Sequence, residues 1–229
     1  MQSEVMYSPA FATAKLTLAA GESVRAESGA MLAMSAGIAM ETSTQGGVLK
    51  GLKRSLLGGE SFFMGKYTAE VHSAWVGVAS KYPGDAPCLD LDGEGMRIET
   101  GALLAVSEGV SVDVKYAGLG NIVIREGATM LHVDGIGKVV IGTYGGIQRF
   151  ELNEGEEMII DTGHLVGVAD TVKMRVGPLS SVSTAVFTGE GLVARMLGPG
   201  TVIMQTRAEQ SFREWLMIGD SRAQNTGRV

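Results

Sequence analysis

The sequence predicts an all-β protein in which one β-rich unit occurs three times and a short helix follows. The first observation is a phrase that returns at residues 21–33, 93–105 and 155–167. Such an internal repeat decides an architecture before any single residue does. The second is a composition with 33 Gly and only 5 Pro, which suits many tight β-turns that keep their backbone donors. The third is the alternation of apolar and polar residues over short runs, which is the period of half-buried strands.

The repeated phrase has the same layout in all three copies. It begins with Gly-Glu, continues with two apolar residues separated by one position, and then has an acidic triplet before a short apolar run. The triplets are Glu27-Ser28-Gly29, Glu99-Thr100-Gly101 and Asp161-Thr162-Gly163. They form either a ring of carboxylates and hydroxyls around an axis, or turns in which these side chains hydrogen-bond nearby backbone. Because a catalytic site seldom needs three copies, the repetition favours turns.

Strands are indicated at several points between the repeated phrases. Val110, Val112 and Val114 alternate with polar residues, which is typical of a half-buried strand. Residues 122–124 and 139–141 are short β-branched runs, which suit more fully buried strands. Short strands with frequent glycine turns predict a sandwich or a barrel.

The predicted organisation is a single domain over residues 1–207 with a C-terminal extension at residues 208–229. Within the extension, Phe212, Trp215 and Leu216 lie at helical spacing, which predicts a short amphipathic helix before a polar tail. The repeats divide the domain into three units, at about residues 1–88, 89–152 and 153–207.

A basic, glycine-rich insert at residues 46–54 lengthens the first unit. Such a loop can present backbone N–H groups to an anion where it runs into a helix start, and nearby cations add charge. The GxxxxGK(S/T) spacing of a P-loop is absent. The alternative is an irregular crossover whose basic residues pair with acidic groups elsewhere in the chain. The candidate ligand-binding residues are Gly46, Gly47, Lys50, Lys53 and Arg54.

The sequence holds no arrangement typical of catalysis. His72, His132 and His164 are far apart in the sequence, whereas a cupin-type metal site needs a clustered His-x-His with a Glu and a further His. Cys88 has no base supplied by a motif, and Ser61 lies outside any GxSxG nucleophile elbow. The sequence therefore predicts no catalytic residue, no metal ligand and no cofactor.

Thirteen methionines are many for a chain of this length. Met31, Met34 and Met40 cluster in the first unit. They form either an adaptable contact surface or the filling of an irregular core.

Three features together resemble a known protein family. They are the string GGVLKGLKRSLLGGESFF, the three acidic triplets and the closing string TGEGLVARMLGPGTVIMQTR. With these, the chain from about Ser3 to Arg207 is similar to the altered-inheritance-of-mitochondria protein family. The resemblance implies a fold similar to the tryptophan RNA-binding attenuator protein (TRAP), a shortened double-stranded β-helix with three units about a pseudo-threefold axis. The attenuator protein's tryptophan and RNA contacts match no residues here.

Fungal members of that family are linked to mitochondrial inner-membrane organisation. The N-terminal residues contain neither a signal peptide nor an Arg-rich transit peptide. The chain therefore resembles the prokaryotic members, for which the resemblance implies no established activity.

Charge and cysteine content limit the expected binding partners and the expected cellular compartment. The net charge of −6 does not favour a nucleic-acid or anionic-membrane partner for the chain as a whole. A lone cysteine cannot form an intrachain disulfide, which fits a reducing compartment. Because no apolar stretch reaches the roughly 18 residues of a membrane span, the sequence predicts a soluble, cytoplasmic protein.

The predicted function is a non-enzymatic interaction or scaffold protein that forms homo-oligomers. The reason is that open β-units leave strand edges and apolar faces that must be covered, by further copies or by a protein partner. Two alternatives stay open. One is an anion-, nucleotide- or nucleic-acid-binding protein that uses residues 46–54, and the other is a cupin-like metalloenzyme.

Overall fold

The computed structural model describes residues 1–42, 64–113, 130–178 and 192–216, and most of these residues lie in β-strands. All strand pairs between the named strands are antiparallel. The all-β fold class that the sequence predicted is therefore confirmed. No helix in the described part of the chain is long and apolar enough to cross a membrane.

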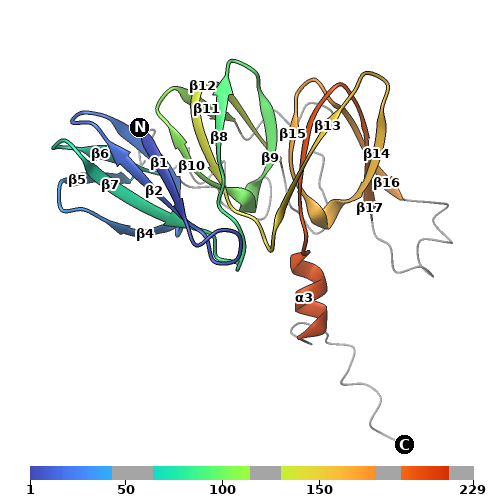
Figure 1. Cartoon of the computed structure of the whole chain (residues 1–229), viewed down its shortest axis with the longest axis horizontal. Helices are drawn as coiled ribbons and strands as arrows, with labels where there is room; N and C mark the ends of the chain where they lie inside the picture. Colours follow the sequence, from blue (N-terminus) through green and yellow to red (C-terminus); the bar gives the residue numbers. More distant parts are fainter. Residues whose placement is uncertain (43–63, 114–129, 179–191, 217–229) are drawn as a thin grey trace, which may run out of the picture.

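The described strands fall into three consecutive groups that lie in a row (Figure 1). Group 1 contains β1 (Gln2–Met6), β2 (Thr13–Leu18), β3 (Ser23–Glu27), β4 (Met31–Met34), β5 (Ile38–Thr42), β6 (Met64–Ala69) and β7 (Ala74–Ala79). Group 2 contains β8 (Cys88–Asp92), β9 (Met96–Glu99), β10 (Leu103–Ser107), β11 (Val110–Asp113) and β12 (Met130–Ile141). Group 3 contains β13 (Ile147–Leu152), β14 (Glu157–Asp161), β15 (Leu165–Ala169), β16 (Lys173–Pro178), β17 (Leu192–Leu197) and β18 (Gly200–Gln205).

The strands of each group pair in the same order. In group 1, β2 and β4 pair with β7, while β3 and β5 pair with β6. In group 3, β13 and β15 pair with β18, while β14 and β16 pair with β17. In group 2, the long strand β12 takes both roles, because β9 and β11 pair with its first half, and β8 and β10 pair with its second half.

Two strand pairs connect the groups, β3 with β10 and β9 with β15. The structure does not show the pseudo-threefold axis that the resemblance implies, since the groups follow one another in a row. The predicted unit boundaries stay a prediction, but β13 precedes the predicted third unit and pairs with β18 of group 3.

The alternating sequence pattern explains how the strands bury one face. In β2, Ala14, Leu16 and Leu18 are buried, and the residues between them are half-buried. A strand places successive side chains on opposite faces, so a period of two gives one apolar face. Val110 and residues 139–141 lie in strands as predicted, whereas Val114 and residues 122–124 lie outside the described residues.

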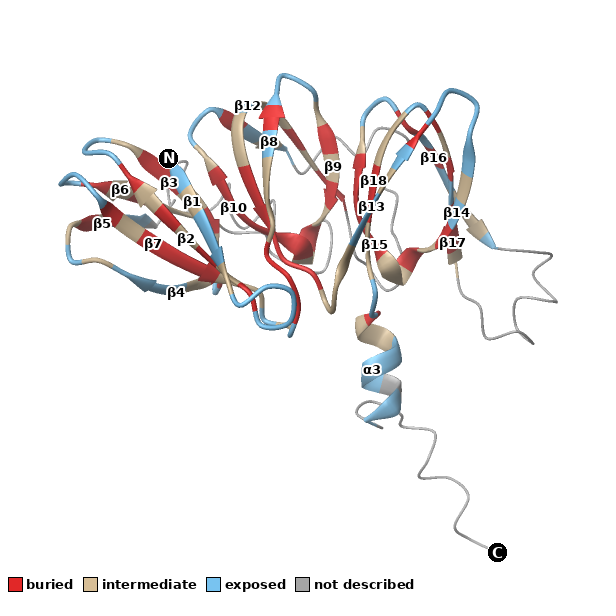
Figure 2. Cartoon of the chain, in the orientation of Figure 1, coloured by how far each residue is buried: buried red, intermediate tan, exposed pale blue. Residues whose placement is uncertain are grey.

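The apolar core continues across the group boundaries, and Figure 2 shows buried segments in all three groups. The cluster in group 1 includes Leu104 and Val140 of group 2. The cluster in group 2 includes Val166 and Ile203 of group 3, and the cluster in group 3 includes Met130 of group 2. Packing therefore supports the two strand pairs that connect the groups.

The first acidic triplet lies in a turn, and the second and third begin the short 3-10 helices η1 (Thr100–Ala102) and η2 (Thr162–His164). The acidic side chains hydrogen-bond nearby backbone, as the second interpretation of the repeated phrase predicted. The Glu99 carboxylate accepts a hydrogen bond of 3.0 Å from the Gly101 N–H, and the Asp161 carboxylate accepts one of 2.9 Å from the Gly163 N–H. In the first copy, Gly29 has a φ of 93°, a conformation that glycine adopts without strain.

The predicted C-terminal helix is present as α3 (Glu209–Trp215). Its Phe212 ring lies 5.8 Å from the Tyr144 ring, which in turn lies 5.3 Å from the Tyr82 ring. Burial raises the pKa of the Tyr82 hydroxyl, and its hydrogen bond with Glu209 of α3 adds to that rise. These contacts hold the start of α3 against the chain.

Candidate interaction site

The two inner junctions, β3–β10 and β9–β15, have the same register. In both, the strand before the acidic triplet of one group meets the strand after the triplet of the next group. The opposed residues are Val24–Ser107, Arg25–Val106 and Ala26–Ala105 at the first junction, and Met96–Ala169, Arg97–Val168 and Ile98–Gly167 at the second.

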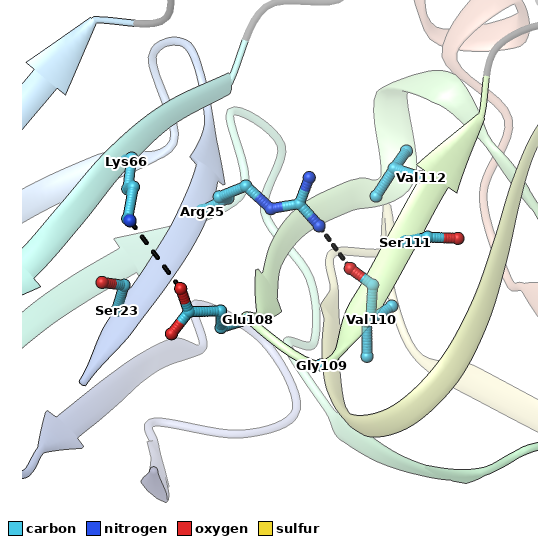
Figure 3. Close-up of a pocket in the computed structure, with 8 residues that line it drawn as sticks. All are labelled: Ser23, Arg25, Lys66, Glu108, Gly109, Val110, Ser111 and Val112. Carbon is cyan, nitrogen blue, oxygen red and sulfur yellow. Dashed lines mark hydrogen bonds and ion pairs between the residues drawn. The ribbon is translucent and has the colours of Figure 1, made fainter.

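The first inner junction carries a set of charged groups (Figure 3). Arg25 Nη2 donates a hydrogen bond to the Val110 carbonyl oxygen of group 2. Lys66 Nζ lies 3.7 Å from Glu108 Oε1. Burial lowers the pKa of the Arg25 guanidinium, and the nearby Glu108 carboxylate opposes this shift. A cleft of about 450 Å³ opens beside these side chains.

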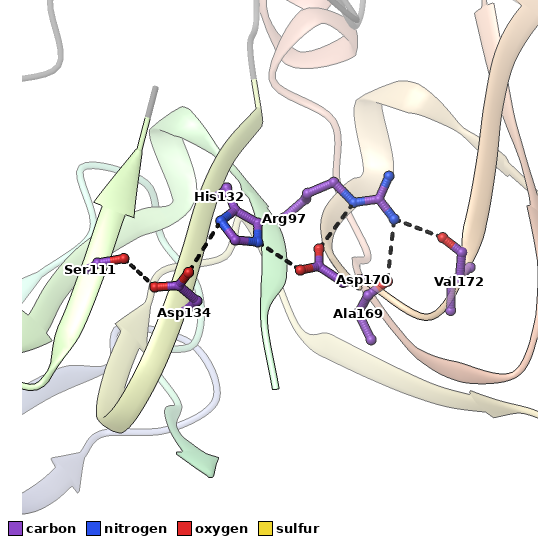
Figure 4. A network of polar contacts seen from close by, with 7 residues as sticks. All are labelled: Arg97, Ser111, His132, Asp134, Ala169, Asp170 and Val172. Atoms are coloured by element: carbon purple, nitrogen blue, oxygen red, sulfur yellow. Dashed lines mark hydrogen bonds and ion pairs between the residues drawn. The ribbon is translucent and has the colours of Figure 1, made fainter. Parts of the chain in front are cut away.

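The second inner junction has the corresponding set (Figure 4). Arg97 Nη2 donates hydrogen bonds to the Val172 and Ala169 carbonyl oxygens, at 2.7 Å and 3.3 Å. Arg97 Nε lies 3.6 Å from Asp170 Oδ1, and His132 Nε2 lies 2.6 Å from Asp170 Oδ2. Burial lowers the pKa of the Arg97 guanidinium, and Asp170 opposes this shift.

These side chains occupy equivalent places at the two junctions. Arg25 and Arg97 stand at the same position of the repeated phrase, and each donates to a carbonyl oxygen that follows a turn of the next group. Glu108 and Asp170 are the acids in those turns. The arginines bind carbonyl oxygens across each junction, and Lys66, Arg97 and His132 pair with the acids of the next group, so these contacts attach one group to the next.

These junction residues are not among those predicted from the sequence, although the sequence contains a signal for them. Both arginines lie between the two apolar positions of the repeated phrase. Alternation alone assigns such a position to solvent. The arginines contact other residues at this position only because their strands pair with the next group.

Within the described part of the chain, two strands at the ends of the row lack this second neighbour, and we call them the outer edges. Among the described strands, β4 of group 1 pairs only with β7, and β14 of group 3 pairs only with β17. Their counterparts at the inner junctions pair on both sides. The outer edges lie at opposite ends of the row (Figure 1).

The outer edges expose apolar side chains at positions that are buried or half-buried at the inner junctions. Leu32 and Met34 of β4 are 62% and 39% exposed, and Ile159 of β14 is 50% exposed. The counterpart of Leu32 in group 2 is Leu104, which is 2% exposed. The methionine cluster of the first unit thus contributes Met34 to a surface, whereas Met31 packs against the core.

The described strand β4 contains no lysine and no proline. Proteins often protect sheet edges with lysine, proline or a bulge. β4 has a register shift between Met31 and Ala33, but β10 and β15 have the same shift and still pair on both sides. The outer edges are therefore the candidate interaction site.

The ligand-binding residues predicted from the sequence lie outside the described residues, so that prediction stays a prediction. They are Gly46, Gly47, Lys50, Lys53 and Arg54.

The histidines are separated in the fold as they are in the sequence. His132 lies at the second inner junction, and His164 Nδ1 lies 2.7 Å from the Gln205 carbonyl oxygen. His72 is exposed in the turn after β6. Across residues 1–42, 64–113, 130–178 and 192–216, no group of three His, Cys, Asp or Glu residues is placed to hold a metal ion.

The chain is similar to a known protein family, to a bacterial relative and to a solved structure. Residues 3–207 match the family model described as mitochondrial biogenesis AIM24. An uncharacterized protein of Streptococcus pyogenes serotype M6 is 23% identical over 210 residues, covering 88% of this chain and 84% of that protein. A crystal structure of a Streptococcus pyogenes protein from a structural genomics programme has a TM-score of 0.79 at 23% identity. The match covers 94% of this chain and 98% of that chain, which shows a shared fold.

Proposed function

The chain belongs to the mitochondrial biogenesis AIM24 family, and we propose that it acts as a non-enzymatic scaffold that self-associates head to tail. In this assembly, β14 of one copy pairs with β4 of the next copy. The observation that carries the proposal is that both outer edges are counterparts of strands that pair at the inner junctions. A joint between copies would repeat a contact that the chain already makes twice.

The inner junctions also supply the register of the proposed joint. Their common register, applied to the outer edges, opposes Met158 with Ser35, Ile159 with Met34, and Ile160 with Ala33. A slip of one residue would turn every side chain of a strand to the other face. The apolar faces of both edges therefore favour this register over its neighbours.

Pairing of the outer edges has a clear physical benefit. Burying a large apolar side chain contributes about 1.5–3 kcal/mol, and Leu32, Met34 and Ile159 all have surface to lose. Pairing also satisfies backbone donors and acceptors along both edges. The contact joins unlike surfaces, so repeated addition gives a closed ring or an open filament.

The non-enzymatic part of the proposal is supported by the polar groups at the inner junctions. Around the cleft of the first junction, Arg25 is bound to a carbonyl oxygen, and Lys66 is paired with Glu108. These groups fasten one part of the chain to another.

Thiol cross-linking tests the proposed joint. With Cys88→Ser as background, Met34→Cys and Ile159→Cys place two thiols in directly opposed positions on different copies. We expect a short bismaleimide reagent to give a ladder of covalent multimers. The matched control combines Met34→Cys with Glu157→Cys, which shifts one thiol by two residues along β14 and should cross-link much less.

The mass of the native protein gives an independent test. Light scattering over the micromolar range should give multiples of the 24.0 kDa chain mass. A mass of one chain at every concentration, together with no cross-linked multimer, would overturn the proposal.

A further inference from the structure

Two of the differences between the outer edges and the inner junctions remove a charge. In the repeated phrase, Ile159 of β14 occupies the place of Arg25 and Arg97. In the turn after β4, Ala36 occupies the place of Glu108 and Asp170. The end that lacks the arginine and the end that lacks the acid are the two surfaces that the proposed joint brings together.

Strand pairing supports the first equivalence without reference to the repeated phrase. Arg25 opposes Lys66 in the β3–β6 pair, and Arg97 opposes His132 in the β9–β12 pair. Ile159 opposes Arg195 in the β14–β17 pair in the same way.

Position along the chain supports the second equivalence. Glu108 lies two residues after Val106, the residue that opposes Arg25. Asp170 lies two residues after Val168, the residue that opposes Arg97. Ala36 likewise lies two residues after Met34, which opposes Ile159 in the proposed register.

Physical chemistry explains why the two positions should change together. An arginine buried at a junction needs acceptors, and an acid next to it needs a cation. If only the acid were replaced, the half-buried arginine would keep its desolvation cost without its partner. If only the arginine were replaced, the more exposed acid would lose a favourable charge interaction across the junction. A joint with Ile159 on one side and Ala36 on the other leaves neither group unmatched.

We propose that this paired exchange selects the partner: the joint between copies is apolar, whereas the junctions within a chain are charged. The inference rests on the proposed head-to-tail assembly and names the residues that give it specificity. If β14 of another copy displaced β3 from β10, Glu108 would lose its ion pair with Lys66 and the nearby charge of Arg25. If β3 paired with β4, Arg25 would face Ala36 and lose its acid. Both of these incorrect pairings are disfavoured, so each outer edge pairs preferentially with the outer edge of another copy.

Arg195 does not contradict this assignment. It takes the place of Lys66 and His132, but it is exposed on β17 and has a polar interaction within the chain. A solvated cation does not require an acid across the joint.

The test transfers the charged pair to the outer edges. We expect Ile159→Arg alone, and Ala36→Asp alone, to raise the concentration for half-assembly at least tenfold. An equal mixture of the two variants should recover assembly, because each charged joint alternates with an unchanged one. The double variant should also assemble, and its assembly should weaken with added salt more than that of the wild type.

Ile136→Arg is the matched control, since Ile136 is 70% exposed on β12 and lies on neither outer edge. It should leave assembly unchanged. Recovery in the mixture also shows that each single variant is folded, and circular dichroism checks this directly.

The outcomes separate this inference from the proposed function. A wild type that stays monomeric overturns both. An assembling wild type whose Ile159→Arg variant assembles equally well overturns the inference alone. So does loss of assembly in both single variants without recovery in their mixture.

Discussion

At the second inner junction, the Arg97 side chain is 13% exposed and reaches across to group 3. It donates to two carbonyl oxygens and faces the Asp170 carboxylate. Hydrogen bonds from a charged donor are among the stronger ones in proteins. Removing the guanidinium would leave these acceptors without a partner at a packed boundary.

We therefore expect Arg97→Ala to lower the free energy of unfolding by about 2–4 kcal/mol. Arg149→Ala is the control, because the Arg149 and Glu151 side chains are both 60% exposed. It should cost less than about 1 kcal/mol. Urea unfolding at one fixed protein concentration measures both. Equal losses in the two variants would contradict the role assigned to Arg97.

Among the elements, β12 is distinctive because it alone pairs with four strands of its group, whereas groups 1 and 3 use two separate strands for these pairings. It crosses from the β9–β11 side of group 2 to the β8–β10 side without a break. Gly135 lies near its middle with a φ of 113°. A Cβ there would collide with the Gly109 carbonyl oxygen. Glycine thus lets the strand turn between its two sets of partners.

Gly135→Ala should destabilise the chain by about 1–3 kcal/mol, because alanine resists this φ and meets the Gly109 backbone. The control is Gly177→Ala in β16, where a Cβ meets nothing within 4 Å. That substitution should change the free energy of unfolding by less than about 0.5 kcal/mol. Chemical unfolding followed by circular dichroism compares the two, and similar losses would argue against the steric explanation.

The sequence predicted the secondary-structure elements better than it predicted which strands pair with each other. The all-β class, the turns at the acidic triplets and the short C-terminal helix follow from local patterns. Glu99 and Asp161 hydrogen-bond within two residues, so nearby sequence contains all the information. The run of β-branched residues at 139–141 likewise placed them in a strand.

The inner junctions could not be predicted in the same way. Arg25 and Val110 are 85 residues apart in the sequence, and alternation assigns an arginine between two apolar residues to solvent. The exposed outer edges could not be predicted from the sequence either, since Leu32 and Leu104 occupy the same place in the repeated phrase. Only strand pairing separates an edge that has a neighbour from one that has none.

At the scale of the whole molecule, the proposed assembly couples stability to concentration. Copies that associate only when folded stabilise the folded state by mass action. We expect a hundredfold increase in protein concentration to raise the Tm by about 5 °C. Trp75 and Trp215 provide intrinsic fluorescence for the measurement. The Ile159→Arg variant should show a nearly constant Tm, and a constant Tm for the wild type would contradict the coupling.

Helix α3 leaves the row beside group 3 (Figure 1), and its Trp215 ring is largely exposed. In a head-to-tail array, every copy points the same way, so each chain places its helix in an equivalent position. A surface that binds one helix weakly would meet many of them at a fixed spacing. Their combined avidity can exceed a single affinity by a factor of about 10²–10⁴. In the proposed assembly, one small helix would gain multivalency from the strand pairing that joins the copies.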